Sequence, residues 1–262
     1  MGRIIAISNQ KGGVGKTTTA VNLAASLAAA EVPTLLVDLD PQGNAGSGLG
    51  RRADAPGPTI YDALIGGARV EECLVPTELP FLTLVPSTPD LTGAEIELVT
   101  VERREHRLAE ALAPVVNRYG VILIDCSPSL GLLTINALTA AHQVLIPLQC
   151  EYYALEGITQ LMRTIDLVKG NLNPKLEVEG VLLTMFDTRN NLAHQVAAEI
   201  RKHFGRKVFQ SVVPRNVRLS ESPSHGKPII LYDVDSTGAQ AYLGLADELL
   251  KRWGKTATRR VG

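Results

Sequence analysis

The chain has 262 residues and a formal net charge of −1, and its 45% hydrophobic and 20% charged residues are the balance of an ordinary globular protein. Only 4% of the residues are aromatic, which argues against a stacking platform for single-stranded nucleic acid. No apolar run approaches the roughly 20 residues that a membrane-spanning helix needs. The N-terminal MGRIIAIS lacks the cleavage site of a signal peptide, so we expect a cytoplasmic protein.

Short β-branched runs alternate with helical patterns along the chain, which predicts a doubly wound α/β fold. Several of the strand candidates are almost continuously apolar, as is typical of parallel strands that are buried on both faces. We therefore expect a mainly parallel sheet with helices on both faces. The expected strands, in chain order, are residues 3–8, 34–40, 81–87, 120–126, 143–149, 178–187 and 207–214.

Helical patterns occupy the intervals between these strands, with apolar residues recurring three and four positions apart. The stretch RRADAPGP, residues 51–58, has the composition of a surface loop rather than a linker. We expect one domain over residues 1–254, followed by a basic flexible tail at 255–262. The expected helices are residues 17–30, 94–116, 155–169, 192–204 and 238–253.

The stretch NQKGGVGKTT, residues 9–18, lies between the first strand and the first helix, which is the setting of a phosphate-binding loop. Backbone N–H groups there can surround the phosphates of ATP at the positive end of the helix dipole. Lys16 is expected to reach the β and γ phosphates, the Thr17 hydroxyl to ligate Mg²⁺, and Thr18 to contact the α-phosphate. The usual pattern needs glycine where Gln10 stands, and Lys11 is an additional cation. The nucleotide-binding residues expected from the loop pattern are Gly12, Gly13, Val14, Gly15, Lys16, Thr17 and Thr18.

Two further strand ends carry aspartates to the same edge of the sheet, where ligands bind in open α/β folds. Asp125 ends the strand VILIDC and is expected to hold Mg²⁺ through water. Asp38 and Asp40 end the strand TLLVDLD, and Asp40 lies further out, where a carboxylate can position an attacking water. Alternatively, Asp40 only forms the turn before Pro41.

The sequence KGGVGKTT resembles the deviant Walker A motif of the ParA/MinD group of P-loop ATPases, and the match extends over nearly the whole chain. Residues 38–50, 125–138, 149–157 and 213–229 make the resemblance closest to the partitioning ATPases of the ParA or Soj type. The resemblance implies a P-loop NTPase fold. It also implies that Lys11 reaches the partner's ATP across a dimer, as an arginine finger does.

The same resemblance implies the remaining site residues and a functional cycle. Asp40 matches the water-activating carboxylate, Asp125 the Walker B residue, and Pro214 and Asn216 the segment that contacts adenine. ATP would drive formation of a homodimer that binds double-stranded DNA without sequence preference on the nucleoid. A ParB/Spo0J-type partner with a short basic N-terminal segment would stimulate the weak ATPase and release the dimer. A replication initiator is a further partner in the family, and the sequence does not distinguish a chromosome from a plasmid.

Positive charge is concentrated late in the chain, which independently indicates a polyanion partner. Residues 189–227 hold eight Lys/Arg against two Asp/Glu, whereas the remainder holds 18 basic and 25 acidic residues. An ordinary solvated surface is the alternative. The family match is best for Arg189 and Arg218, and Arg215 could instead serve the nucleotide. The other expected DNA contacts are Arg201, Lys202, Arg206 and Lys227.

Three alternatives remain. A membrane-associated division-site ATPase of the MinD type needs a C-terminal amphipathic helix, and KRWGKTATRRVG has no apolar stripe, so we expect no membrane contact. An iron–sulfur reductase needs two well-placed cysteines; Cys126 follows Asp125, but Cys73 and Cys150 have no matching motif. We expect all three cysteines to be small buried hydrophobes. For a ligase such as a cobyrinate amidase, no substrate motif is recognised.

Overall fold

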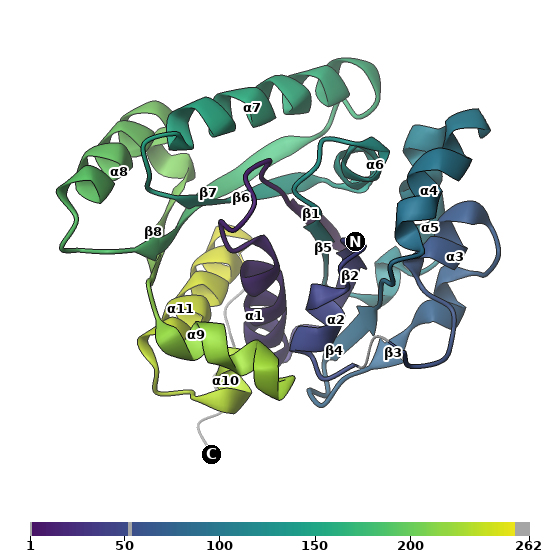
Figure 1. The fold of residues 1–262 in the computed structure, drawn as a ribbon, viewed down its shortest axis with the longest axis horizontal. Helices are drawn as coiled ribbons and strands as arrows, with labels where there is room; N and C mark the ends of the chain where they lie inside the picture. Colours follow the sequence, from purple (N-terminus) through teal and green to yellow (C-terminus); the bar gives the residue numbers. More distant parts are fainter. Residues whose placement is uncertain (1, 52–53, 255–262) are drawn as a thin grey trace.

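The computed structural model of the protein describes residues 2–51 and 54–254. Its centre is an eight-stranded sheet of order β3-β4-β2-β5-β1-β6-β7-β8 (Figure 1). Every neighbouring pair is parallel except β3 and β4, so the predicted mainly parallel α/β fold is confirmed. The antiparallel edge strand β3 was not predicted. The strands are β1 (Arg3–Ile7), β2 (Thr34–Leu39), β3 (Val75–Pro76), β4 (Leu82–Val85), β5 (Val121–Cys126), β6 (Gln143–Gln149), β7 (Glu177–Phe186) and β8 (Val208–Pro214).

Helices cover both faces of the sheet, as expected (Figure 1). One face carries α1 (Lys16–Ala29), α2 (Asn44–Gly48), α9 (Val217–Glu221), α10 (Ile229–Tyr232) and α11 (Thr237–Arg252). The other face carries α3 (Ile60–Ile65), α4 (Leu91–Glu97), α5 (Arg107–Leu112), α6 (Leu132–Ala140), α7 (Ala154–Asn171) and α8 (Asn191–Phe204).

The alternation of side chains along each strand builds one hydrophobic core on each face. In β1, Ile5 and Ile7 belong to the core beneath α1 and α11, whereas Ile4 and Ala6 belong to the opposite core. Because buried strands contribute to both cores, they read as continuous apolar runs in the sequence.

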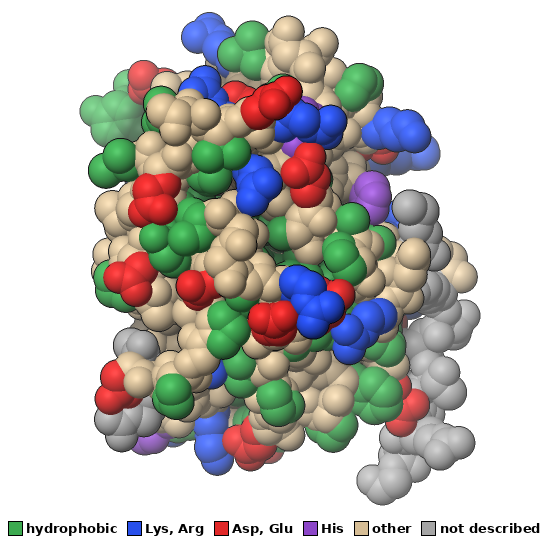
Figure 2. Space-filling model, turned by 90° about the vertical axis from the view of Figure 1, so that its right-hand side faces the viewer, with side chains coloured by type: hydrophobic (Ala, Val, Ile, Leu, Met, Phe, Trp, Pro, Cys, Tyr) green, Lys and Arg blue, Asp and Glu red, His purple; other side chains and the backbone are tan. Residues whose placement is uncertain are grey.

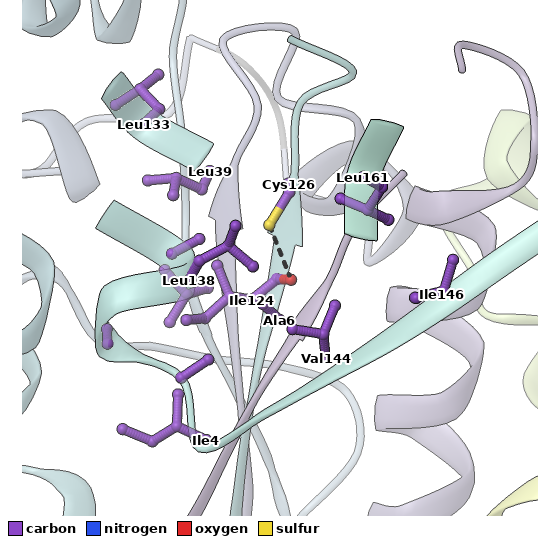
Figure 3. Close-up of a cluster of buried hydrophobic side chains, with 14 of the residues drawn as sticks. Ile4, Ala6, Leu39, Ile124, Cys126, Leu133, Leu138, Val144, Ile146 and Leu161 are labelled. Atoms are coloured by element: carbon purple, nitrogen blue, oxygen red, sulfur yellow. Dashed lines mark hydrogen bonds between the residues drawn. The ribbon is translucent and has the colours of Figure 1, made fainter. Parts of the chain in front are cut away.

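The three cysteines are buried in the core, as predicted. Figure 3 shows Cys126 among aliphatic side chains, where its thiol donates to the carbonyl of Ile124 at 3.8 Å. Burial raises the pKa of Cys126, and it raises the pKa of Cys73 and Cys150 to about 11. These thiols therefore stay protonated at neutral pH and pack as small hydrophobes.

The predicted helix over residues 94–116 is wrong, because the chain breaks it into α4, 3-10 turns and α5. Arg103 has a φ of 54°, which a continuous helix does not allow. The side chain of Asn136 in α6 stabilises the interrupted conformation between α4 and α5. It donates to the carbonyl of Arg104 at 2.8 Å and accepts the N–H of Leu108 at 3.0 Å.

The predicted basic tail, residues 255–262, lies outside the described residues. In the parts of the chain that the structure describes, no helix is both long and apolar enough to span a membrane.

Candidate functional site

The loop between β1 and α1 crosses the edge of the sheet at the carboxyl ends of the strands. Gly13 and Gly15 have φ values of 72° and 83°, a left-handed conformation that favours glycine. Gly15 occupies the N-cap position of α1, and no side chain accepts a hydrogen bond from the first N–H groups of the helix. These N–H groups are therefore available to bind a phosphate. The hydroxyl of Thr184 in β7 anchors the loop by donating to the carbonyl of Val14 at 2.9 Å.

The two loop lysines occupy different surroundings. Lys16 is buried, and its Nζ donates to the carbonyl of Lys11 at 3.1 Å. Burial lowers the pKa of Lys16, while the negative charges around it, including Asp125 and Asp40, act in the opposite direction. Lys11 is more exposed and forms an ion pair with Glu151, just beyond β6. Thus Lys16 lies within the predicted phosphate cradle, whereas Lys11 is held at its outer side.

Asp38 and Asp125 lie side by side on β2 and β5 and are both fully buried. The Asp38 carboxylate accepts three backbone N–H groups, from Asp40 at 3.2 Å, Ala45 at 3.0 Å and Gly46 at 3.1 Å. Burial raises the pKa of Asp38 to about 7, against the effect of these hydrogen bonds. Asp38 therefore fixes the turn after β2 and the start of α2.

Both oxygens of Asp125 are buried without a hydrogen bond of ordinary geometry among the described residues. Burial and the neighbouring charge of Asp38 raise its pKa, while the Thr17 hydroxyl and the Lys16 ammonium act to lower it. A buried carboxylate without partners is costly unless a ligand completes it.

The unpaired Asp125 oxygens beside the Thr17 hydroxyl fit Mg²⁺, which prefers oxygen ligands. Within residues 2–51 and 54–254, no group of three or more His, Cys, Asp or Glu side chains is placed to hold a metal. Mg²⁺ is usually held by one or two carboxylates, water and substrate phosphates. Thr17 and Asp125, the two predicted metal ligands, are therefore brought together.

Asp40 lies just beyond β2 and is buried next to the loop. One of its carboxylate oxygens accepts the N–H of Gln42 at 3.0 Å, and its carbonyl accepts the N–H of Gly43 at 3.0 Å. These are the contacts of a turn-forming aspartate, so Asp40 does stabilise the turn that begins before Pro41. Its predicted role in positioning water stays a prediction.

The predicted adenine segment follows the edge strand β8. Pro214 ends β8 and lines a cavity of about 700 Å³ between β7, β8, α8 and α11. Asn216 is the N-cap of α9: its oxygen accepts the N–H of Leu219 at 3.2 Å, and its amide donates to Thr237 at 2.8 Å. The Asn216 side chain therefore shapes this segment, a role that the sequence did not reveal.

The basic residues of segment 189–227 differ in their pairing. Arg189 binds the carboxylate of Asp187 through Nε at 3.0 Å and Nη2 at 2.9 Å, and these bonds lower the pKa of Asp187 to about 2. Arg218 pairs with Glu221 at 2.9 Å and Asp233 at 3.3 Å.

Lys202, near the end of α8, is exposed and lies 3.5 Å from Glu199, so its role as a DNA contact stays a prediction. Arg201 lines the 700 Å³ cavity. No ion pair within the described part of the chain involves Arg201, Arg206, Arg215 or Lys227. These four cations are consequently the least neutralised of the predicted DNA contacts.

Two residues of the site were missed from the sequence. Glu151 pairs with Lys11 across 140 positions of sequence. Asn22, one turn beyond Thr18, donates to the Thr18 carbonyl at 2.8 Å and accepts the N–H of Ile229 at 2.7 Å. A lone asparagine in an Ala/Leu-rich helix is a signal that could have indicated Asn22.

Comparison with known proteins places this site in context. A family model described as an AAA domain matches residues 2–178. The chain is 65% identical to the chromosome partitioning protein ParA of Myxococcus xanthus, covering 100% of this chain and 93% of that protein. It is 59% identical to the sporulation initiation inhibitor protein Soj of Bacillus subtilis, covering 95% and 98%. The crystal structure of a cobyrinic acid a,c-diamide synthase from Mycobacterium smegmatis with bound ADP and magnesium superposes with a TM-score of 0.85, 38% identity and coverage of 99% and 100%.

Proposed function

The chain belongs to the ParA/Soj family of chromosome-partitioning ATPases, and from this premise we propose that it binds Mg²⁺ and ATP and couples weak ATP hydrolysis to DNA segregation. The observation that carries the proposal is the unpaired, buried carboxylate of Asp125 beside Lys16 and Thr17. A fold does not keep such a group for stability, since it is costly without a ligand.

In this proposal the loop residues bind and orient the nucleotide. The N–H groups at the start of α1 surround the phosphates, and Lys16 exchanges the Lys11 carbonyl for the β and γ phosphates. Thr17 and Asp125 would hold Mg²⁺, which would offset the negative charge of the phosphates. Asp40 orients the attacking water, and the segment at Pro214 and Asn216 lies against the adenine.

Lys11 acts across a homodimer that forms in the ATP state. In the single chain its ammonium is paired with Glu151, at the outer side of the loop. We infer that it exchanges this carboxylate for the partner subunit's ATP, where a cation stabilises charge on the transferring phosphoryl group.

The basic segment 189–227 binds double-stranded DNA through phosphates and without sequence preference. The charge asymmetry of the chain and the unpaired cations Arg201, Arg206, Arg215 and Lys227 support this step. A ParB/Spo0J-type partner stimulates hydrolysis and releases the dimer from the nucleoid. The cytoplasmic, nucleoid-associated location follows from this cycle.

An ATP-dependent amidation is a second candidate, because the superposed M. smegmatis protein is described as a diamide synthase. That protein is 38% identical to this chain, whereas the M. xanthus ParA protein is 65% identical and the B. subtilis Soj protein 59% identical. The higher identities favour partitioning. ATP-dependent conversion of cobyrinic acid to its a,c-diamide by this protein, with ammonia supplied as the nitrogen source, would support the synthase instead.

Titration of ATP with Lys16→Ala tests the nucleotide site. Loss of the main side-chain cation should weaken binding by about 30-fold or more, since truncating one partner of a buried, hydrogen-bonded charge pair costs about 2–5 kcal/mol. Lys175→Ala is the matched control, because Lys175 is exposed and lies on the loop between α7 and β7. Near wild-type affinity in Lys16→Ala would overturn the assignment of the loop.

A further inference from the structure

The cavity of about 700 Å³, here called the edge cavity, lies beside β8, the last strand of the sheet, between α8 and α11 (Figure 1). The pairing of β7 with β8 shifts register on both sides of Leu183, which leaves the sheet irregular at this edge. Three alanines of the flanking helices, Ala197, Ala198 and Ala241, line the cavity and leave its space open. The rest of its apolar wall consists of Leu183 and Phe186 from β7 and Val212 and Pro214 from β8.

Arg201 supplies positive charge to the edge cavity. It follows Ala197 and Ala198 on α8 by about one turn, so all three side chains face the cavity. The Arg201 side chain is half-buried, and within residues 2–51 and 54–254 neither a hydrogen bond nor an ion pair engages it. Among the described residues, no aspartate or glutamate lines the cavity. Because a cation that is withdrawn from water is costly without a partner, this arrangement favours an anion as the occupant.

The other basic residues of this region do not share the situation of Arg201. His194 also lines the cavity, but its Nε2 lies 2.8 Å from the carbonyl oxygen of Thr188, and its ring packs edge-on against Phe186. The remaining unpaired cations of segment 189–227 are exposed to water, which compensates their charge: Arg206, Arg215 and Lys227. Arg201 is therefore the cation that a ligand in the edge cavity would meet.

We propose that the edge cavity is a binding site for a small organic anion, namely a carboxylate with an aliphatic body. The carboxylate would pair with the guanidinium of Arg201, which can donate two parallel hydrogen bonds, and the aliphatic body would cover the apolar wall. The volume lies within the range of about 300–1,000 Å³ that small-molecule sites occupy. This site is additional to the proposed ATPase function and does not depend on it.

The edge of β8 is closed to another common occupant of such a position, an added peptide strand. The Glu248 carboxylate of α11 accepts the N–H groups of Gln210 and Ser211, each at 3.0 Å, and Pro214 has no N–H. A peptide strand would therefore find few free donors here. The edge cavity is also separate from the nucleotide-binding loop, because residues 9–18 do not line it.

Isothermal titration calorimetry with decanoate tests the site in the nucleotide-free protein, and decylammonium is the cationic counterpart. Decanoate should bind at a single site per chain, whereas decylammonium should not bind. Arg201→Ala should weaken decanoate binding about tenfold or more, since a hydrogen bond to a charged group contributes at least that factor. Arg201→Lys keeps the charge and should recover part of the affinity. Ala241→Phe, which fills the cavity and keeps Arg201, should abolish binding.

Two control variants remove similar groups outside the edge cavity. Lys202→Ala removes the cation next to Arg201, and the Lys202 side chain is 78% exposed. Ile96→Ser removes an aliphatic side chain that is 76% exposed on α4. That end of the molecule lies far from α8, and Figure 2 shows apolar side chains exposed there between acidic and basic ones. Decanoate binding within about twofold of the wild type is expected for both controls.

Several results of the titration would overturn the site. They are unchanged decanoate binding in Arg201→Ala or Ala241→Phe, equal weakening in a control variant, and binding of decylammonium as tight as that of decanoate. Far-UV circular dichroism verifies that each variant is folded, and the comparison of Arg201→Ala with Arg201→Lys remains decisive if Ala241→Phe does not fold.

Other occupants of the edge cavity would be recognised by competition. Displacement of decanoate by Mg²⁺ and ATP would show that the cavity belongs to the adenine site, and displacement by double-stranded DNA would assign Arg201 to the DNA interface. A nucleotide-free dimer that Arg201→Ala abolishes would identify a second copy of this chain as the occupant. Each of these results would overturn the proposal. A wild type that does not hydrolyse ATP would refute the proposed function, and the decanoate result would stand by itself.

Discussion

Replacing Asp125 by asparagine is expected to stabilise the nucleotide-free protein and to abolish the further stabilisation by Mg²⁺ and ATP. The side chain is fully buried, and neither carboxylate oxygen has a hydrogen bond of ordinary geometry among the described residues, although the Thr17 hydroxyl lies beside them. Asparagine keeps a polar side chain of the same size but removes the buried charge, and the smaller desolvation cost should gain about 1–3 kcal/mol at a pH where Asp125 is ionised. With a shift of about 2–4 °C per kcal/mol for a chain of this size, Tm should rise by about 2–12 °C.

The size of this effect depends on pH. Burial raises the pKa of Asp125 well above its ordinary value of 3.8, so its charge destabilises the folded state. The destabilisation is absent at low pH and grows as the pH rises from the unfolded pKa towards the folded pKa. The charge of Asp38, whose pKa is raised to about 7, helps to raise the pKa of Asp125, so the two carboxyls titrate together and the difference between the two proteins reports on the pair.

The same variant should lose the response to nucleotide. ATP at 100 times its Kd stabilises the folded wild type by about 2.7 kcal/mol, or about 5–10 °C in Tm. Thermal unfolding, monitored by circular dichroism in EDTA and again with Mg²⁺ and ATP, measures both effects. The control is Asp166→Asn, because Asp166 is an exposed residue of α7. The reasoning would be refuted if the Tm of Asp125→Asn in EDTA were no higher than that of the wild type. It would also be refuted if Mg²⁺ and ATP raised the Tm of the variant as much as that of the wild type.

Three further substitutions separate the steps of the cycle. Lys11→Ala should leave much of the monomer's nucleotide binding but remove dimerisation and hydrolysis, and a normal ATP dimer in light scattering would count against action in trans. Asp40→Ala should stop hydrolysis, because no carboxylate then positions the water, and the ATP dimer should accumulate on DNA, because a negative charge near the γ-phosphate is removed. Hydrolysis at the wild-type rate would show that Asp40 only forms the turn before Pro41. Arg189→Ala or Arg218→Ala should weaken DNA binding alike for all sequences and lower the salt slope by about one phosphate contact, with dimerisation intact.

The strands were predictable because their signal is local. QVLIPLQ predicts β6 since a strand that is covered on both faces is apolar at successive positions. The antiparallel β3 has only two residues, Val75 and Pro76, which is too short for any periodicity. α6 is buried around most of its circumference and therefore lacks the one-sided apolar stripe that indicated helices such as α7 and α8.

The break between α4 and α5 could not be predicted, because its cause lies elsewhere in the chain. The charged residues of 94–116 favour a helix locally, but Asn136 binds Arg104 and Leu108 from about 30 positions away. Tertiary hydrogen bonds of this kind override helix propensity, which amounts to less than about 1 kcal/mol per residue.

The candidate site was predictable where its residues form a contiguous motif. The loop of residues 9–18 and Asp125 at a strand end can be recognised in the sequence because parallel strands deliver their ends to one edge. The pairing of Lys11 with Glu151 and the bond from Ile229 to Asn22 span 140 and 207 positions. Only the folded chain reveals such contacts, and they also show which basic residues are already neutralised.

DNA binding with ATP, with ADP and without nucleotide tests the central claim most directly. The wild-type protein is titrated with a double-stranded DNA of arbitrary sequence and with a second, unrelated sequence of equal length. The proposed partitioning cycle predicts binding with ATP, equal for the two sequences, and much weaker binding with ADP or without nucleotide. Equal DNA affinity in all three nucleotide conditions, or no DNA binding with ATP, would contradict the account.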